Sequence, residues 1–277
     1  MNEAPAFTPL PPALRPSRKA ARVWATIATV VGFLTGALAW LKINPLRFFT
    51  EFPYVWNLAT EMVPPNWGLL LGPKVWASVG ETVAMAVLGT VTGGLLAFGL
   101  SFLAARNTSP NLLTRNLFRV FLALQRVAPD YAIMLIILIV VGFGPFAGTL
   151  ALAIGSTGMF GKFFADTIEN LDERSTEGVR VLGGTRTQEM RYGVVPQVLP
   201  SFVANGFFLL EVNMGGAIAL GAFGGGGLGF HLAVAGDTLN YRDMLAYVFF
   251  IVVLMILLER CSDFFRRRIF QSSSTLK

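Results

Sequence analysis

The sequence has almost none of the residues that build disulfides and metal sites. Its 277 residues include one cysteine, Cys261, and one histidine, His231. A single cysteine excludes an internal disulfide, and a single histidine excludes a His/Cys metal cluster. The sequence also offers no nucleophile–base pair and no paired carboxylates. We therefore expect neither an enzyme nor a cofactor-binding protein.

Charged residues are scarce as well. Only 14% of the residues are charged and 54% are hydrophobic, which excludes an ordinary soluble domain and indicates an all-α integral membrane protein. The net charge of +6 would suit nucleic acid, but the basic residues are distributed by membrane side rather than clustered on one face. We expect contact with membrane lipid and none with nucleic acid.

Long uncharged runs predict six transmembrane helices. After an N-terminal tail at residues 1–22, the first span covers 23–42 and a segment rich in aromatic residues and proline covers 43–76. Five further spans form a core at 77–262, followed by a tail at 263–277. We expect these five spans near residues 82–105, 122–142, 146–165, 197–222 and 241–260. Small-residue spacings that allow close helix approach occur in the second span, at Gly89, Gly93, Gly94 and Gly99.

The basic residues orient these spans. Of the 22 Lys and Arg residues, only four fall in the pieces predicted to be external: Lys42, Arg47, Lys74 and Arg242. The positive-inside rule then predicts that both termini, and the loop between the fourth and fifth spans, face the cytoplasm. A hairpin of two spans after Pro200 would give seven crossings and put the C-terminal arginines outside, so six is favoured.

The third and fourth predicted spans must share one apolar stretch of the sequence. Residues 131–161 are uncharged but too short for two spans, so the third begins near Leu122 and carries Arg126 and Asp130 into or close to the membrane. On a helix these residues stand at i and i+4 and can face each other. Both an interfacial ion pair and a role in a pathway fit this placement.

The longest charged stretch, residues 162–200, lies between the fourth and fifth spans. Gly183-Gly184 interrupts charges at helical spacing, so we expect two short helices that meet at a bend. Thr185 and Gln188 have the spacing of a capping box, which would begin the second helix.

Charge pattern alone would make this stretch an ordinary solvated loop. Glu177, Gly183 and Pro196, however, fit the spacing Glu-Ala-Ala-x3-Gly-x9-Ile-x-Leu-Pro. This spacing resembles the cytoplasmic coupling loop, here residues 166–196, of the permease subunits of bacterial ABC importers. The sequence departs from the pattern at Gly178, Val179, Gly193 and Val195.

Polar residues inside predicted spans are candidates for a translocation path. Glu211 and Asn213 lie in the fifth span, where an ionisable group is costly unless it faces a partner or water. They line a path or gate, or else make a buried helix contact, for instance with Arg126; both interpretations stay open. We add Ser156 and Thr157 of the fourth span to the predicted path.

The segment Gly224–Gly229 formally contains G-x-G-x-x-G. No strand is expected before it, and it lacks the Lys-Ser/Thr of a phosphate loop. We interpret it as a flexible turn or a re-entrant stretch near an outer gate. The gate residues would be Gly224, Gly226 and Gly229, and the neighbouring His231 and Asp237 are expected on the external surface.

Short motifs between about residues 64 and 270 resemble the phosphonate-type ABC permease family, whose members import phosphonates, phosphite or hypophosphite. These motifs are Pro64-Pro65-Asn66-Trp67, Glu81-Thr82, Ala104-Ala105-Arg106-Asn107, Gly142–Gly148, Gly161-Lys162 and Glu211-Val212-Asn213. The resemblance implies a type I (MetI-like) permease fold in the bacterial inner membrane, a homodimer, a cytoplasmic ABC ATPase dimer and a periplasmic solute-binding protein. The coupling residues it implies are Glu177, Gly178, Arg180, Gly183, Gly184 and Pro196.

Two positions differ from what is often present in that family. An arginine and a histidine are replaced by Met214-Gly215-Gly216 and by Gly155-Ser156. Their loss favours a smaller or less charged substrate, such as phosphite or hypophosphite. The alternatives are a permease for another small solute and an ion-coupled secondary transporter. The secondary transporter would need two repeated halves with broken helices, and the sequence shows no convincing internal repeat.

Overall fold

The computed structural model describes residues 18–42, 44, 47–172 and 174–274, and every regular element in those ranges is a helix. The chain divides into two units, residues 1–60 and 61–277. The predicted N-terminal tail falls mostly outside the described ranges. The all-α class expected from the sequence is confirmed.

The first unit is dominated by α1 (Arg18–Trp40), which covers most of the first predicted span and is long and apolar enough to cross a membrane. Its large apolar side chains are exposed, including Trp24 and Phe33. Such exposure is costly in water, whereas lipid tails are as apolar as these side chains. Two shorter helices follow, α2 (Arg47–Thr50) and α3 (Phe52–Met62).

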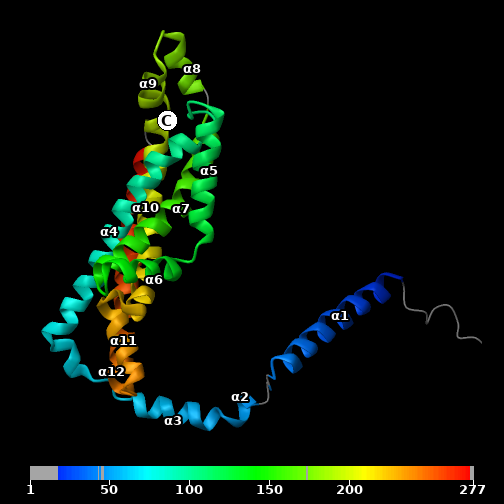
Figure 1. Cartoon of the computed structure of the whole chain (residues 1–277), viewed down its shortest axis with the longest axis vertical. Helices are drawn as coiled ribbons and strands as arrows, with labels where there is room; N and C mark the ends of the chain where they lie inside the picture. Colours follow the sequence, from blue (N-terminus) through cyan, green and yellow to red (C-terminus); the bar gives the residue numbers. More distant parts are fainter. Residues whose placement is uncertain (1–17, 43, 45–46, 173, 275–277) are drawn as a thin grey trace, which may run out of the picture. The chain divides into compact units, whose positions relative to one another are not determined.

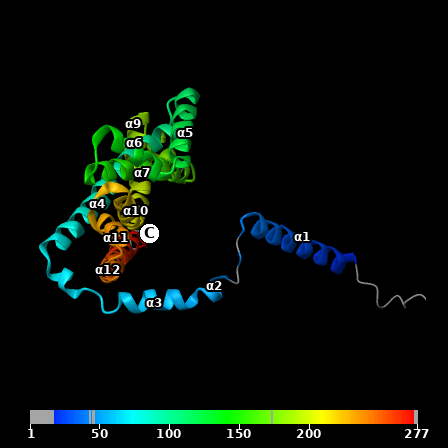
Figure 2. The same ribbon diagram turned by 60° about the horizontal axis from the view of Figure 1, so that its bottom comes forward.

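Three long helices form the centre of the second unit: α4 (Pro73–Ala104), α7 (Pro145–Glu169) and α10 (Val195–Leu220). They run side by side in the bundle of Figure 1, and the turned view of Figure 2 shows the same grouping. Their shared interior contains small side chains, and Ala86 and Ala217 have no exposed surface. Close packing of backbones, rather than large side chains, holds this centre together.

Glycine lies where α4 meets α7. A Cβ atom at Gly93 would be 2.6 Å from the carbonyl oxygen of Ala153, and one at Gly89 would be 2.7 Å from Leu152 Cβ. The predicted close helix approach is therefore confirmed at these two positions. Gly99, which belongs to the same sequence pattern, has no neighbour within 4 Å.

The apolar helices are fewer than the six spans expected. Four stretches of the described chain are long and apolar enough to cross a membrane, and a bent pair adds a fifth if it counts as one span. The four are Lys19–Trp40, Pro73–Ala104, Arg186–Gly225 and Tyr241–Arg268. The predicted fourth span corresponds to α7, a 25-residue helix that is not among them. Its many glycines and polar residues lower its hydropathy.

The bent pair corresponds to the third predicted span. α5 (Leu112–Val127) and α6 (Asp130–Val141) meet at 92°, with Ala128-Pro129 extended between them. Proline has no N–H to continue a helix and disfavours helical backbone at the preceding residue. The prediction that Arg126 and Asp130 face each other along one helix is therefore wrong.

The glycine-rich segment is packed against its neighbours, which argues against the flexible-turn alternative, while the re-entrant alternative stays a prediction. A π-helical turn, η4 (Gly221–Gly225), leads into α11 (Gly227–Asp237) through Gly224 and Gly226, whose φ angles are 103° and 82°. A Cβ atom at Gly229 would collide with a carbonyl oxygen of α10. Glycine is required here both for the backbone conformation and for the close approach of two helices.

The last helix, α12 (Tyr241–Ser274), continues beyond the predicted end of the sixth span, so the predicted C-terminal tail is helical as far as it is described. α11 packs against α12, and the imidazole of His231 stacks on Tyr247 with ring centroids 5.8 Å apart. His231 is thus partly buried between helices, and its predicted place on the external side stays a prediction. Asp237 is exposed, as expected.

The segment before α4 packs on the beginning of α12. Asn66 Nδ2 donates to Asp243 Oδ1 at 2.8 Å, and the ring of Trp67 meets Phe249 edge to face at 5.3 Å. A 3₁₀ turn, η2 (Trp67–Leu71), then leads into α4. The Pro-Pro-Asn-Trp motif therefore ties the N-terminal end of α4 to α12.

Candidate translocation and coupling sites

A buried polar cluster joins the three central helices. Asn213 of α10 accepts from Ser156 Oγ of α7 at 3.0 Å and donates to Thr90 Oγ1 of α4 at 2.9 Å. Asn213 and Ser156 are both buried. Two of the four predicted path residues therefore come together, with a third partner that the sequence analysis missed. The sequence did not distinguish Thr90, because threonine is common in apolar spans and this span contains others.

Thr157, the residue next to Ser156, points to a different contact. Its hydroxyl lies 2.7 Å from the carbonyl oxygen of Ala153 and 3.3 Å from that of Gly93. Both carbonyls belong to the contact between α4 and α7. Its geometry is that of a helix-packing residue, so the structure separates Thr157 from its predicted partners.

Beside the polar cluster lies a cavity of about 320 Å³, between the α5–α6 bend, α7 and α10. Its polar lining comes from Gln125, Arg126, Asp130, Ser156 and Asn213. The bend brings Arg126 and Asp130 into this one cavity even though they no longer share a helix. The cavity brings two charged side chains together with neutral hydrogen-bonding groups and is the best candidate for the path.

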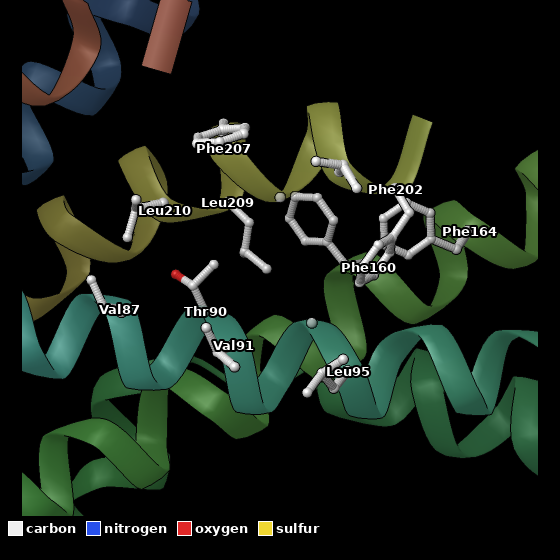
Figure 3. Close-up of a pocket in the computed structure, with 13 residues that line it drawn as sticks. Val87, Thr90, Val91, Leu95, Phe160, Phe164, Phe202, Phe207, Leu209 and Leu210 are labelled. Carbon is white, nitrogen blue, oxygen red and sulfur yellow. The ribbon is translucent and has the colours of Figure 1, made fainter. Parts of the chain in front are cut away.

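A second cavity, of about 280 Å³, lies between α4, α7 and α10 and has an almost entirely apolar lining. Figure 3 shows the rings of Phe160, Phe164 and Phe202 gathered in one part of it, with Thr90 the labelled residue that carries oxygen. The Thr90 hydroxyl is already bonded to the carbonyl oxygen of Ala86, at 2.6 Å. This space offers nothing to an anion, which would lose its hydration without gaining donors.

Glu211, predicted to line the path, lies elsewhere. Its carboxylate accepts from Arg266 of α12 at 3.2 Å, and both side chains are partly buried. The suggested contact between Glu211 and Arg126 is absent from the described structure. Glu211 joins α10 to α12, and Arg266, which falls in the predicted C-terminal tail, is the partner that the sequence did not reveal.

The charged stretch after α7 forms a lobe at one end of the bundle, the end opposite α11 in Figure 1. Gly183, with a φ of 78°, separates α8 (Arg174–Val181) from α9 (Arg186–Gln188). The capping box is present, and Thr185 N donates to Gln188 Oε1 at 2.7 Å. The predicted bend and helix start are both confirmed. A π-helical stretch, η3 (Glu189–Val194), then leads into α10, whose first turn contains Pro196.

An ion pair closes this lobe. Arg180 Nε donates to Glu189 Oε1 at 2.9 Å and so links α8 to η3. The hydrogen bond from Arg180 lowers the pKa of Glu189, and the charges of Arg180 and Arg186 add to this effect. At the tip, Val181 and Leu182 are 85% and 88% exposed. Val181 and Leu182 thus form an exposed apolar pair at the tip of a charged lobe.

The lobe is hydrogen-bonded to the base of the bundle. Arg186 Nη2 donates to the carbonyl oxygens of Thr108 and Ser109, at 3.2 and 2.7 Å. Asn107 of the same loop donates to the carbonyl oxygen of Ile168 in α7 at 2.8 Å, and Glu169 forms an ion pair with α5. This gives the Ala-Ala-Arg-Asn motif a role: its loop connects the lobe to α5 and α7.

At the other end of the bundle, α4 caps α11. Glu81 Oε2 accepts from Gly227 N, and Thr82 Oγ1 accepts from Leu228 N, both at 2.9 Å. These two N–H groups at the start of α11 have no acceptor within the helix itself. The Glu-Thr motif thus holds the short helix that follows the glycine-rich segment, and Gly226 and Gly229 act through packing.

Solved structures identify the class of this fold. A chain of the MetNI methionine ABC transporter, solved in an inward-facing conformation, matches 71% of this chain and 96% of its own length, with a TM-score of 0.62 and 20% sequence identity. A bacterial ABC importer of the polysaccharide alginate matches 90% of this chain and 99% of its own, with a TM-score of 0.64 and 14% identity. The chain has the fold of an ABC-importer permease.

Sequence comparison gives the family. Residues 97–273 match the model of the binding-protein-dependent transport system inner membrane component. The chain belongs to this family of membrane proteins.

Three relatives have named transport roles. The phosphate-import permease protein PhnE of Mycolicibacterium smegmatis is 37% identical over 87% of this chain, which spans only 45% of that protein. A putative phosphite transport permease, HtxC of Stutzerimonas stutzeri, is 32% identical over 87% of this chain and 85% of its own length. The phosphite permease PtxC of the same organism is 34% identical over 81% of each chain.

Proposed function

We propose that this protein is the membrane-spanning subunit of an ATP-driven importer for a phosphorus oxyanion: a phosphonate, phosphite or hypophosphite. Two copies would form the path, a cytoplasmic ABC ATPase dimer would bind the lobes, and a periplasmic solute-binding protein would deliver the substrate. The chain itself hydrolyses no ATP and needs no cofactor in this proposal.

The observation that carries the proposal is the construction of the lobe. Its tip presents Val181 and Leu182 to solvent, while Arg186 ties its base to the loop between α4 and α5. A lobe built in this way can pass the movement of a bound partner to the helices that line the polar cavity. Differential affinity of the ATPase for two arrangements of the bundle would then drive the change between them.

The substrate class rests on the relatives and on the polar cavity. The three relatives described above are named for phosphate or phosphite transport. The cavity offers one guanidinium, one carboxylate and neutral hydrogen-bonding groups, which suits a small oxyanion better than an apolar or large solute. Arg126 supplies a cation in place of the arginine that the sequence lacks at Met214-Gly215-Gly216.

The proposal is tested by reconstituting the permease in liposomes with its ATPase and solute-binding protein and measuring uptake of labelled phosphite. Uptake should require ATP and the binding protein, and it should persist when ion gradients are collapsed. Uptake by the permease alone, driven by a proton or sodium gradient, would instead identify a secondary transporter.

Coupling is tested at the tip of the lobe. Leu182→Asp should reduce ATPase binding and uptake about tenfold or more, because a carboxylate buried in an apolar contact loses its hydration. Leu182→Met, which keeps the side chain apolar, is the matched control and should keep both activities. Equal ATPase binding by the two variants would reject the lobe as the docking element.

A further inference from the structure

Two charged side chains in the polar cavity have no partner within the described part of the chain. Arg126 and Asp130 both line the cavity of about 320 Å³, yet neither makes a hydrogen bond or an ion pair there. Both residues are exposed in the described chain. Ionisable groups in a membrane-spanning segment are costly unless they face water, a partner or a ligand, and they mark sites where an ion or a ligand passes. The bend at Pro129 keeps these two charges from neutralising each other along a helix.

The surroundings fit Asp130 in its observed position. A Cβ atom at Gly155 would collide with the Asp130 carboxylate, so only glycine on this face of α7 leaves the space that the carboxylate occupies. Gln125 Oε1 is buried in the same region without a hydrogen-bond partner among the described residues. A rotation of the Gln125 amide by 180° would put its N–H groups where Oε1 now lies, because the oxygen and nitrogen of an amide are told apart only by their hydrogen bonds.

The two charges set different demands on a ligand. A guanidinium has five N–H donors and no acceptor, so Arg126 calls for an oxyanion. An ionised carboxylate only accepts, so Asp130 repels a bare oxyanion but binds one that offers a donor hydrogen. Ser156 and Asn213 can both donate and accept, and they add hydrogen bonds without adding charge.

We propose that this cavity is a binding site within the membrane for a small oxyanion that carries an O–H group. Arg126 binds the charged oxygens, and Asp130 accepts the hydrogen of the P–O–H group. This inference rests on the proposed function and deepens it, because it assigns substrate selection to the permease as well as to the binding protein.

The proposal separates two anions of equal charge. Hydrogen phosphite carries one P–O–H group, whereas hypophosphite carries its hydrogens on phosphorus and has no O–H donor. A site that leaves an acceptor unpaired discriminates against the ligand that lacks the donor. Hydrogen phosphite should therefore bind at least about tenfold more tightly than hypophosphite.

Binding is measured on the full-length permease in complex with its ATPase, in lipid nanodiscs and without the solute-binding protein, by calorimetric titration with sodium phosphite or sodium hypophosphite. Mildly acidic buffer keeps phosphite in its singly charged form. Arg126→Gln should weaken binding of both anions about tenfold or more, whereas Arg115→Gln, a control near the opposite end of α5, should change neither.

Asp130→Asn gives the decisive comparison. An amide can donate as well as accept, so this variant should lose most of the preference for phosphite and bind hypophosphite more tightly. Asp237→Asn, at the exposed end of α11, is the matched control and should keep the wild-type preference. Thermal melting of each variant identifies any loss that comes from unfolding.

Three results would overturn the inference. One is the absence of binding of either anion to the wild-type complex at millimolar concentration, and another is equal affinity for the two anions. The third is an Asp130→Asn variant that folds and keeps the full preference. The proposed function would stand in each case if ATP-driven uptake with the binding protein is still observed, so the two failures are distinguishable.

Discussion

At the scale of single residues, the interior of this membrane protein is organised by a few polar side chains. Asn213 connects three helices through Ser156 and Thr90, whereas Glu211, two positions earlier, connects α10 to α12 through Arg266. Residues two apart on a helix point in different directions, which explains why one sequence motif serves two contacts.

The first prediction concerns Asn213. Asn213→Ala should lower the free energy of unfolding by about 1–3 kcal/mol, because the buried Ser156 hydroxyl and the partly buried Thr90 hydroxyl, on two helices, lose their partner. The change is measured by unfolding the purified protein in mixed micelles. Asn205→Ala is the control: its amide bonds locally to the carbonyl oxygen of Ser201 four residues earlier, and its effect should be clearly smaller. Equal effects would contradict a linking role for Asn213.

At the scale of elements, the glycine-rich segment and the lobe differ in what holds them. The segment at residues 221–229 is fixed by backbone packing and by the cap from Glu81 and Thr82. The lobe is fixed by polar contacts, through Arg180, Arg186 and the capping box. The stability of the glycine-rich segment should therefore depend on side-chain volume, whereas that of the lobe should depend on pH and charge.

The second prediction tests the packing of α11 on α10. Gly229→Ala should destabilise the protein by several kcal/mol or prevent its folding, because the added methyl group collides with the carbonyl oxygen of Ile218. Gly215→Ala is the matched control, because a methyl group added there would have no neighbouring atom within 4 Å, and it should be neutral or slightly stabilising. Yield and melting temperature in detergent distinguish the two variants.

The third prediction concerns the pH dependence of the lobe. The pKa of Glu189 is lowered from its usual value of 4.5 by Arg180, so its carboxylate stabilises the lobe above that pH. The stabilisation should disappear as the pH falls through the lowered pKa. Hydrogen exchange of residues 174–194, corrected for intrinsic rates, should rise in acid.

A test variant and a control variant complete the hydrogen-exchange experiment. Glu189→Gln should exchange faster at neutral pH and lose the acid-dependent increase, because its side chain no longer titrates. Asp172→Asn, a carboxylate change at the start of the lobe, should keep most of the increase. An unchanged pH dependence in Glu189→Gln would show that another group controls the lobe.

At the scale of the whole molecule, the basic residues predict which side of the membrane each part faces. The lobe and α11 lie at opposite ends of the bundle (Figure 1), so they should be accessible from opposite sides. The lobe should face the cytoplasm together with most of the Lys and Arg residues.

The fourth prediction tests this orientation by labelling with a membrane-impermeant maleimide. With Cys261→Ser removing the natural thiol, Leu182→Cys should be labelled only in inverted vesicles. Asp237→Cys should be labelled in intact cells. Labelling of Leu182→Cys from outside would overturn the topology and the proposed coupling to an ATPase together.

The sequence was most informative where a local rule applies. The Gly183 bend and the Thr185–Gln188 capping box depend only on neighbouring residues, and both are confirmed. Close packing at Gly89 and Gly93 followed from small residues in an apolar helix. The prediction for Arg126 and Asp130 was wrong because helical spacing was assumed across a proline.

What the sequence by itself determined is the helical membrane class, the lobe with its bend and the family motifs, because these depend on composition and on spacing along the chain. Only the tertiary structure decided which polar residues meet. In the structure Asn213 bonds to Thr90, Glu211 forms an ion pair with Arg266, and Arg126 and Asp130 line one cavity. Such contacts join helices far apart in the chain, and no local rule encodes them.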